Sequence, residues 1–405
     1  MPGPLHGYRI VDLTSMISGP LATMILADQG ADVIKVENPD GGDHTRAANN
    51  RRNGFSASFL NNNRNKRSLA LDLKDPKAGE ALLRLVATAD VFVQNFRPGV
   101  ADRMGFGEDA LRAVKPNLIY VSISGFGETG PFAGKPVYDP LVQAMSGLAT
   151  IQAGSDSERP RLVRTIVPDK LTAVTASQAI TAALLARERT GQGQHVRISM
   201  LDSVIAFLFA SDMGSQTFVG DEFPQQDAAS FIDLIYETAT TYISAAVQSN
   251  KEWEALTRAV DKPEWLEDPR FKTPALRQRN IDDRLAMTQG VLLTRSAAAW
   301  LERLTAAGVP CAPVLTRGQM IRDPQVQAMG IVVESDHKDA GRIRGARPAA
   351  RFSTTYESIY RGGPALGEHN DSILAELGYS GSDIALLLGR QPPHGRAVGA
   401  AIKRK

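Results

Sequence analysis

Short β-rich runs alternate with amphipathic stretches through the first 125 residues of this chain. The runs have the length and composition of strands, and they cover residues 8–14, 32–38, 68–73, 90–96 and 118–124. Helical patterns separate them, at residues 20–30, 76–89 and 108–115. Strands that alternate with helices form parallel, right-handed βαβ units. The pattern therefore predicts a doubly wound, Rossmann-like α/β domain.

The loops after the expected strands are the first place to look for a site. In a doubly wound sheet, ligands bind beyond the carboxyl ends of the strands. Four such loops contain glycine together with polar or charged residues, namely residues 14–20, 37–46, 94–99 and 125–130.

The last of these loops, "GFGETG" from Gly125 to Gly130, matches the dinucleotide-binding pattern G-x-G-x-x-G. That pattern requires a helix to begin at its last glycines, because the pyrophosphate lies on the helix N-terminus. The chain continues instead as "PFAGKPVYDP", whose prolines exclude a regular helix. We therefore interpret the segment as a strand-end turn and reject a nicotinamide or flavin cofactor.

Composition narrows the class of protein further. The chain has 405 residues, 43% hydrophobic and 22% charged, with a net charge of +2, which argues against a strongly basic nucleic-acid binder. Cys311 is the single cysteine, so no intrachain disulfide can form. The first residues lack a signal-peptide pattern, and no apolar stretch is long enough to span a membrane. We expect a cytoplasmic protein that does not bind membranes or nucleic acid.

The pattern of polar and apolar residues changes near Asp221, which indicates a second domain. Before it, a loop region at about 131–167 leads to a long helix at 170–193, followed by a strand and an apolar helix. We expect a large α/β domain at 1–215, a smaller α+β domain at 225–325, and a segment at 330–405 that returns to the large domain.

Basic residues cluster between His44 and Arg103, with eleven Lys or Arg against five Asp or Glu. Their position beside the expected site loops favours an anionic ligand such as phosphate. A solvated charged face is the alternative. The six histidines do not have metal-ligand spacing, so we expect no metal and no permanently bound cofactor.

Several blocks in succession resemble the class III coenzyme A transferases, the group of formyl-CoA transferase and the carnitine and bile-acid CoA-transferases. The blocks include "GYRIVDLTSMISGPLATMILADQGADVIKVENPDGGDHTR" and "VQNFRPG", and they cover residues 7–46, 61–99, 118–148, 184–204, 308–314, 323–330 and 366–380. The resemblance implies a homodimer in which the two subunits pass through each other as interlocked rings.

The resemblance also implies that Asp169, just before the long helix, is the nucleophile. A carboxylate can attack a thioester to give a mixed anhydride, and the released CoA thiolate can then form an aspartyl-CoA thioester. At a helix start, backbone donors and the helix dipole are expected to hold the carboxylate ionised. Simple N-capping is the alternative role for an Asp at this position.

Further residues are assigned to the CoA substrate by the same resemblance. Leu71 and Lys74 correspond to adenine and phosphate contacts, and Lys135 to a basic residue near the 3′-phosphate or the thioester cleft. The remaining candidates in the strand-end loops are Ser15, Met16, Ile17, Asn95, Phe96, Arg97 and Gly125, and Arg103 lies on the segment that follows the 94–99 loop.

Tyr138 helps to distinguish between two related groups of enzymes that the sequence resembles. The related α-methylacyl-CoA racemases look as if they carry a histidine at this point and use it with the aspartate for two-base proton transfer. Tyrosine has too high an ordinary pKa for that role at neutral pH, so "VYDP" favours the transferase.

One segment departs from the pattern. Oxalate-type formyl-CoA transferases look as if they close a glycine-rich loop of the smaller domain over the intermediate, whereas residues 222–244 contain no glycine. The donor and acceptor therefore stay unassigned.

The sequence predicts an enzyme that moves CoA from an acyl-CoA to a free carboxylic acid through Asp169. An acyl-CoA racemase or epimerase and a non-catalytic acyl-CoA-binding protein are the alternatives.

Overall fold

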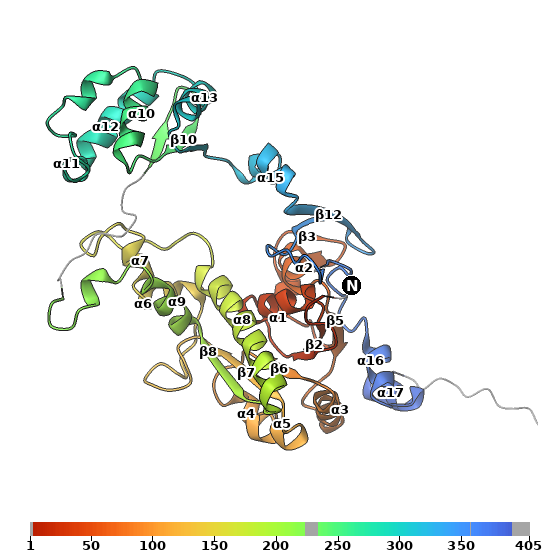
Figure 1. Cartoon of the computed structure of the whole chain (residues 1–405). Coiled ribbons are helices and arrows are strands. Elements are labelled where there is room, and N and C mark those ends of the chain that lie inside the picture. The colour runs from red at the N-terminus through yellow and green to blue at the C-terminus, as the bar shows by residue number, and fades with distance from the viewer. Residues whose placement is uncertain (1–2, 223–233, 357, 391–405) are drawn as a thin grey trace, which may run out of the picture. The chain divides into compact units, whose positions relative to one another are not determined.

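The computed structural model describes residues 3–222, 234–356 and 358–390. The chain divides into two compact units (Figure 1). Unit 1 contains Met1–Ala229 and Ile331–Lys405, and unit 2 contains Ser230–Gly330. Because unit 2 is inserted into the sequence of unit 1, two chain connections join the units.

A six-stranded parallel sheet forms the centre of unit 1. Its strands are β1 (Arg9–Asp12), β2 (Asp32–Glu37), β5 (Arg67–Ala70), β6 (Val91–Gln94), β7 (Ile119–Ser124) and β8 (His195–Ser199). The spatial order is β5-β2-β1-β6-β7-β8. Counted along the chain, this is 3-2-1-4-5-6, the order of Rossmann-type sheets. The expected parallel α/β architecture is confirmed.

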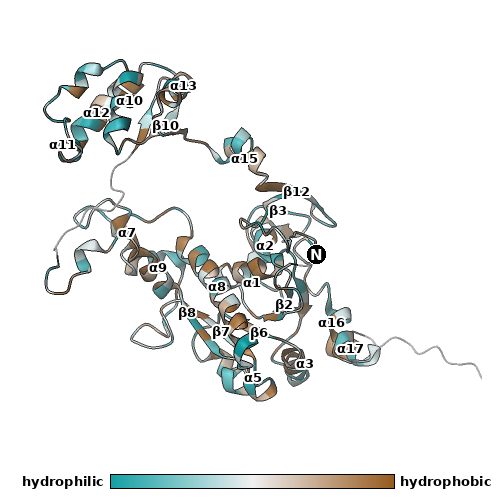
Figure 2. Cartoon of the chain, viewed as in Figure 1, coloured by the Kyte–Doolittle hydropathy of each residue, from teal (hydrophilic) through white to brown (hydrophobic). Residues whose placement is uncertain are grey.

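Both faces of the sheet are covered, because successive residues of each strand point to opposite sides. Val11 faces one buried cluster with residues of α3 (Pro76–Ala87), α5 (Glu108–Val114), α16 (Asn370–Glu376) and α17 (Gly381–Leu387). Ile10 faces a second cluster with residues of α1 (Ser18–Asp28) and α8 (Val167–Thr190). In Figure 2 the helices carry both hydrophobic and hydrophilic residues, as expected for amphipathic helices with one face toward the core and the other toward solvent.

Helices α1 and α8 pack closely in unit 1. Small side chains make this possible, since Ala22, Ala173 and Ala176 are fully buried between them and the sheet. Helix α8 begins three residues earlier than the sequence predicts, with Pro168 in its first turn, and it ends at Gly191 with φ +72°. Asp169 therefore lies inside the first turn, and the N-cap residue is Ile166.

The region at 131–167, expected to be a loop, contains two short helices, so that expectation was partly wrong. They are α6 (Asp139–Met145), with Pro140 in its first turn, and α7 (Leu148–Ile151). The other helices of this part of unit 1 are α2 (Ala57–Asn63), α4 (Val100–Arg103) and α9 (Met200–Leu208), and a small ladder joins β3 (Arg51–Arg52) to β4 (Phe55–Ser56).

The C-terminal segment lies against the edge strand β5. It begins with a hairpin of β12 (Val332–His337) and β13 (Gly341–Ala346). Ser68 donates its backbone N–H to Nδ1 of His369 at 3.2 Å, and Ala70 donates to Oδ1 of Asn370 at 2.8 Å. These side chains satisfy edge-strand donors that would otherwise be free to pair with another chain.

Unit 2 has its own core around a three-stranded antiparallel sheet of β9 (Ile235–Glu237), β10 (Tyr242–Ala245) and β11 (Cys311–Pro313). Trp253, Phe271 and Trp300 fill this core. The helices of the unit are α10 (Asn250–Ala259), α11 (Pro274–Arg279), α12 (Ile281–Leu292), α13 (Ala297–Ala307), α14 (Arg317–Met320) and α15 (Pro324–Met329). Among the described residues of both units, no helix is long and apolar enough to cross a membrane.

Candidate active site

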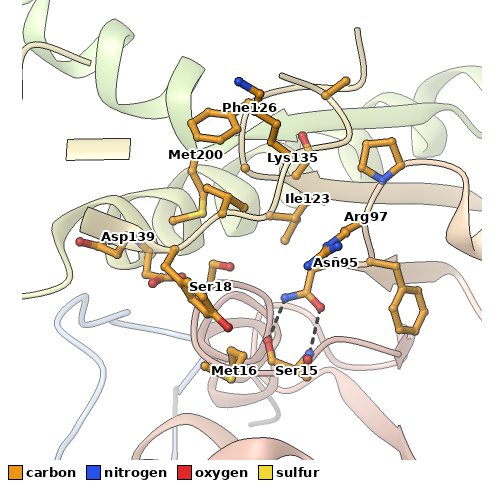
Figure 3. A pocket seen from close by; sticks show the side chains of 18 residues that line it. Ser15, Met16, Ser18, Asn95, Arg97, Ile123, Phe126, Lys135, Asp139 and Met200 are labelled. Atoms are coloured by element: carbon orange, nitrogen blue, oxygen red, sulfur yellow. Dashed lines mark hydrogen bonds between the residues drawn. The ribbon is translucent and has the colours of Figure 1, made fainter. Parts of the chain in front are cut away.

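The strand order reverses between β1 and β6, and a pair of hydrogen bonds joins the two loops that leave this point. The backbone N–H of Ser15 donates to Oδ1 of Asn95 at 2.9 Å, and Nδ2 of Asn95 donates to the Ser15 carbonyl at 2.8 Å (Figure 3). Ligands of doubly wound sheets bind in the crevice outside such a reversal. The two loops therefore hold each other at the expected binding position.

A cavity of about 180 Å³ opens beside this pair. The loops after β1, β6 and β7 form part of its wall, and the first turns of four helices form the rest. The first-turn residues are Ser18 of α1, Asp139 of α6, Asp169 of α8 and Met200 of α9. Helix N-termini present unpaired backbone donors and a positive dipole end, so the cavity is suited to a carboxylate or a developing oxyanion.

A second cavity of about 240 Å³ adjoins the first, because Ser15 and Phe96 line both. Leu71 and Lys74 lie in this second cavity, together with Met104. The two cavities lie on either side of the β1–β6 reversal. Their common wall allows one extended ligand to occupy both.

Most of the site residues expected from the sequence line one cavity or the other. The first is lined by Ser15, Met16, Asn95, Phe96, Arg97, Gly125, Lys135, Tyr138 and Asp169, and the second by Ser15, Leu71, Lys74 and Phe96. Two candidates line neither. Ile17 is the N-cap residue of α1, and the Nη1 atom of Arg103 lies next to Gly99 at the end of the "QNFRPG" loop.

Asp169 is half-buried in the first cavity, and its carboxyl group is not held ionised as strongly as the sequence predicted. Burial and the nearby charge of Asp139 raise the pKa of Asp169 to about 6. Hydrogen bonding to the hydroxyl and backbone N–H of Ser18 acts in the opposite direction. The group therefore ionises close to neutral pH, so it can act as a nucleophile and also be reprotonated.

Asp139 is a site residue that the sequence reasoning did not select, although it belongs to the "VYDP" block. Its side chain is buried, and its Oδ2 accepts the backbone N–H of Asp169 at 3.2 Å. Its Oδ1 accepts Nε2 of Gln143 at 2.6 Å, and Oε1 of Gln143 accepts the backbone N–H of Val163 at 2.9 Å. Asp139 thus fixes the start of α8 with respect to α6. Ser18, also not selected, lies within the candidate loop 14–20.

Two fully buried lysines support the loop between β1 and α1. Nζ of Lys35 donates to the Thr14 carbonyl at 2.7 Å and lies 2.9 Å from Oδ2 of Asp43. Asp43 in turn accepts the backbone N–H of Met16 at 3.2 Å, and Met16 has an unusual φ of +70°. The backbone conformation of this loop therefore depends on charges buried beneath it.

The second lysine pairs with β1 itself. Nζ of Lys66 lies 2.9 Å from Oδ2 of Asp12 and donates to the Pro20 carbonyl at 2.8 Å. Burial lowers the pKa of Lys66 to about 8, and the charge of Asp12 limits the decrease.

The basic cluster at 44–103 therefore contains two kinds of residue. Several of its members pair with carboxylates of the fold, namely Arg46, Arg64, Lys66 and Arg67. In the described part of the chain, the side chains of the other seven form no ion pair with a carboxylate, and two of them, Lys74 and Arg97, line the cavities. These two are placed to contact an anionic ligand. Over the same described residues, no group of three or more His, Cys, Asp or Glu side chains could hold a metal ion.

Comparison with known proteins identifies the family. Residues 5–370 match CoA-transferase family III. The chain belongs to this family. Its relatives include the human succinyl-CoA:glutarate CoA-transferase, 34% identical over 92% of this chain and 86% of that protein. The formyl-CoA:oxalate CoA-transferase of Escherichia coli O6:H1 is 33% identical over 96% of this chain and 99% of that protein. The resemblance drawn from the sequence blocks is confirmed.

Solved structures of similar proteins agree with this family III assignment. The Mycobacterium tuberculosis protein Rv3272 has a TM-score of 0.80 and 31% identity, over 92% of this chain and 99% of that chain. A CaiB/BaiF family protein from Brucella suis has the same TM-score and identity, over 93% of this chain and 100% of that chain. The chain is therefore a CoA-transferase with the fold of this group.

Proposed function

We propose that this family III CoA-transferase moves CoA between an acyl-CoA and a free carboxylic acid with Asp169 as the covalent acceptor. The observation that carries the proposal is the position of Asp169. It lies in a cavity at the β1–β6 reversal, surrounded by four helix N-termini, with a pKa near 6. A carboxylate that is mostly ionised at neutral pH and incompletely solvated is a suitable nucleophile for a thioester.

The first half-reaction uses the donor acyl-CoA. A carboxylate oxygen of Asp169 attacks the thioester carbonyl carbon, the C–S bond breaks, and CoA leaves as the thiolate. The product is a mixed anhydride between the acyl group and Asp169. The thiolate then attacks the aspartyl carbonyl of the anhydride, which forms an aspartyl-CoA thioester and releases the donor acid as a carboxylate.

The second half-reaction reverses this order with the acceptor. The acceptor carboxylate attacks the aspartyl thioester and displaces CoA thiolate, giving a new mixed anhydride. The thiolate attacks the acceptor carbonyl of that anhydride, so the acceptor leaves as acyl-CoA and Asp169 returns to its carboxylate form. Neither half-reaction consumes water or a net proton.

We propose that the two cavities hold the two ends of the CoA substrate. We place the nucleotide at Leu71 and Lys74, and the thioester at Asp169, with the pantetheine passing Ser15 and Phe96, which both cavities share. Backbone donors at the helix starts would stabilise the tetrahedral oxyanion of each step. Among the described residues that line either cavity there is no histidine, which disfavours two-base racemisation of the α-carbon.

The donor and acceptor are best sought among small acids. The relatives named above act on formyl-CoA with oxalate and on succinyl-CoA with glutarate, so dicarboxylates are the first acceptors to test. The lack of glycine in residues 222–244 argues against the oxalate pair. Residues 223–233 of that segment lie outside the described residues.

We also propose the interlocked homodimer. Two chain connections join unit 1 to unit 2 along the sequence, and interlocking requires two such connections. Helices α6, α8 and α9 contact one another and expose several large apolar side chains, namely Leu141, Met145, Val174, Leu185 and Phe207. An exposed apolar surface of this kind favours association. Light scattering after size exclusion should give twice the subunit mass, unchanged on dilution to nanomolar concentration. A cytoplasmic location stays a prediction.

The experiment that tests the mechanism traps the covalent intermediate. Incubation with an acyl-CoA from a panel that includes succinyl-CoA, followed by hydroxylamine, should convert Asp169 to a hydroxamate that peptide mass spectrometry can locate. Asp169→Ala should reduce CoA exchange by about a thousandfold or more. Asp202→Ala changes an exposed Asp in the first turn of α9 and serves as the control. Full exchange activity in Asp169→Ala would contradict the proposal.

A further inference from the structure

The segment 125–138, between β7 and α6, forms one wall of the cavity that contains Asp169. The residues that line the cavity from this segment are Gly125, Phe126, Ala133, Lys135, Val137 and Tyr138. The segment begins with the "GFGETG" sequence. Because we reject a dinucleotide cofactor, the function of this sequence is still to be explained. Its conformation decides where this wall lies.

The two ends of the segment are packed, but its middle is exposed. The Gly125 carbonyl accepts the backbone N–H of Leu201 at 3.0 Å, and Val137 packs directly on Gly125. Between these ends, Phe126 and Lys135 contact Phe132, which belongs to the same segment. These contacts shape the segment internally without fixing it to the sheet.

Glu128 makes the polar connection from the middle of the segment to the sheet. Its Oε1 accepts the hydroxyl of Ser122 on β7, and its Oε2 accepts Nε of Arg197 on β8 at 2.9 Å. In the described part of the chain, no other side chain of residues 126–137 makes a hydrogen bond or ion pair outside the segment. Phe126 and Val137 also pack on a buried apolar cluster that includes Val142 and Met200. Among the described residues, Glu128 is therefore the polar anchor of residues 126–137, beside the apolar packing at the two ends.

A network behind Glu128 holds Ser122 in place. The ring of His195 lies between two acceptors, with Nε2 2.8 Å from Oγ of Ser122 and Nδ1 2.6 Å from Oε2 of Glu108. Ser122 is buried, and its one hydroxyl proton is donated to Glu128, so Nε2 of His195 must donate to Ser122. Arg197 pairs with both carboxylates, with Nε 2.9 Å from Oε2 of Glu128 and Nη2 3.4 Å from Oε2 of Glu108.

This network occupies a different cavity from Asp169. It has a volume of about 300 Å³ and shares only Phe96, Pro98, Ile123 and Ser124 with the first cavity. Asp169 and Asp139 are held by α8, α6 and Gln143, none of which takes part in the network. Loss of the anchor should therefore move the cavity wall without moving the nucleophile.

We propose that Glu128 is a positioning residue that fixes segment 125–138 as the wall against which CoA binds. This rests on the proposed function, since it treats the cavity as a CoA site. The ligand does not touch Glu128. Through its bonds to Ser122 and Arg197, Glu128 limits the movement of Lys135 and its neighbours, so that the cavity is preformed before CoA enters.

The test compares variants of the full-length protein by hydrogen exchange without ligand and by calorimetric binding of CoA. Glu128→Ala should speed exchange in the peptide spanning 125–138 at short labelling times and raise the Kd for CoA by about three- to tenfold. Glu128→Gln keeps an acceptor for Ser122 and should recover part of both effects. Asp109→Ala removes a carboxylate from the same cavity, where it has no bond to the segment, and should match the parent protein.

Each outcome decides the proposal. Parent-like exchange in Glu128→Ala would show that Glu128 is not the anchor, and faster exchange with an unchanged Kd would show that the segment is not a binding wall. An equal loss in Glu128→Ala and Asp109→Ala would indicate a general charge effect and also overturn it. If the parent protein fails to bind CoA, the proposed function is wrong, and the exchange result alone then decides whether Glu128 holds the segment.

Discussion

At the scale of single residues, the environment of Asp169 combines two opposing influences. Burial and Asp139 favour its protonated form, whereas Ser18 favours the carboxylate. The resulting pKa near 6 keeps the group mostly ionised at pH 7 while leaving it more basic than an ordinary aspartate. A more basic carboxylate is a better nucleophile, and it is a poorer leaving group from the anhydride.

The first prediction concerns the pH dependence of transfer. Only ionised Asp169 can attack a thioester, so kcat/KM should fall as pH decreases through about 6. Asp139→Asn removes the neighbouring charge and should move this acidic limb to lower pH. Ser18→Ala removes one donor to the carboxylate and should move it to higher pH. Initial rates from pH 4.5 to 8 measure both shifts. If the acidic limbs of both variants coincide with the acidic limb of the parent protein, the assignment of this limb to Asp169 is contradicted.

The second prediction concerns stability. The folded-state pKa of Asp169 is raised, so the contribution of this group to the free energy of unfolding is lost as pH rises from about 4 through about 6 and the carboxyl must ionise in place. Asp169→Asn carries no charge and should be more stable than the parent at pH 7.5 by about 1–3 kcal/mol. The difference should vanish near pH 4. Urea unfolding at the two pH values tests this, and equal stability at pH 7.5 would contradict it.

Sequence reasoning could reach Asp169 but not its partner Asp139. The proposed nucleophile follows from the family blocks and from chemistry that a carboxylate can perform. Asp139 becomes relevant only because α6 and α8 bring residues thirty positions apart into contact. The backbone N–H of Asp169 then donates to Oδ2 of Asp139. The raised pKa has the same origin, since burial is a property of the packed structure. A helix-start rule alone predicts the opposite direction.

At the scale of elements, strands and long helices were predictable and short helices were not. The inner strands β1, β2, β6 and β7 coincide with runs rich in apolar residues, because burial on both faces favours hydrophobic side chains. Helices α6 and α7 are seven and four residues long, too short for a helical period to appear in the sequence. Proline and glycine around them gave the appearance of a loop.

The third prediction concerns the β7–α6 segment. A Cβ atom on Gly125 would lie 2.2 Å from Cγ1 of Val137, so Gly125→Ala must displace Val137 and the adjoining start of α6. We expect an activity loss of about tenfold or more, because sub-ångström misplacement near a reacting group is costly. Gly134→Ala is the matched control. Gly134 belongs to the same segment, and its Cβ would meet no atom within 4 Å. Measurements of kcat and KM compare the Gly125→Ala and Gly134→Ala variants. Equal activities of the two variants would contradict the prediction.

At the scale of the whole molecule, unit 1 carries both cavities on one edge of its sheet. The reversal between β1 and β6 creates the crevice, and segments far apart in the sequence complete it. Lys35 and Lys66 are fully buried beneath the crevice, where Lys35 pairs with Asp43 and Lys66 with Asp12 of β1. Part of the local basic charge thus stabilises the scaffold, and Lys74 and Arg97 line the cavities.

The fourth prediction separates the roles of the two cavities. If Lys74 contacts a phosphate of CoA in the second cavity, Lys74→Ala should raise the KM for acyl-CoA by about tenfold, as expected for a charged hydrogen bond. An acyl-pantetheine thioester lacks the nucleotide, so the same variant should use it as well as the parent does. Lys77→Ala, on the first turn of α3 and lining neither cavity, is the control. An equal loss with both would place Lys74 near the thioester, and no loss with either would remove the second cavity from the CoA site.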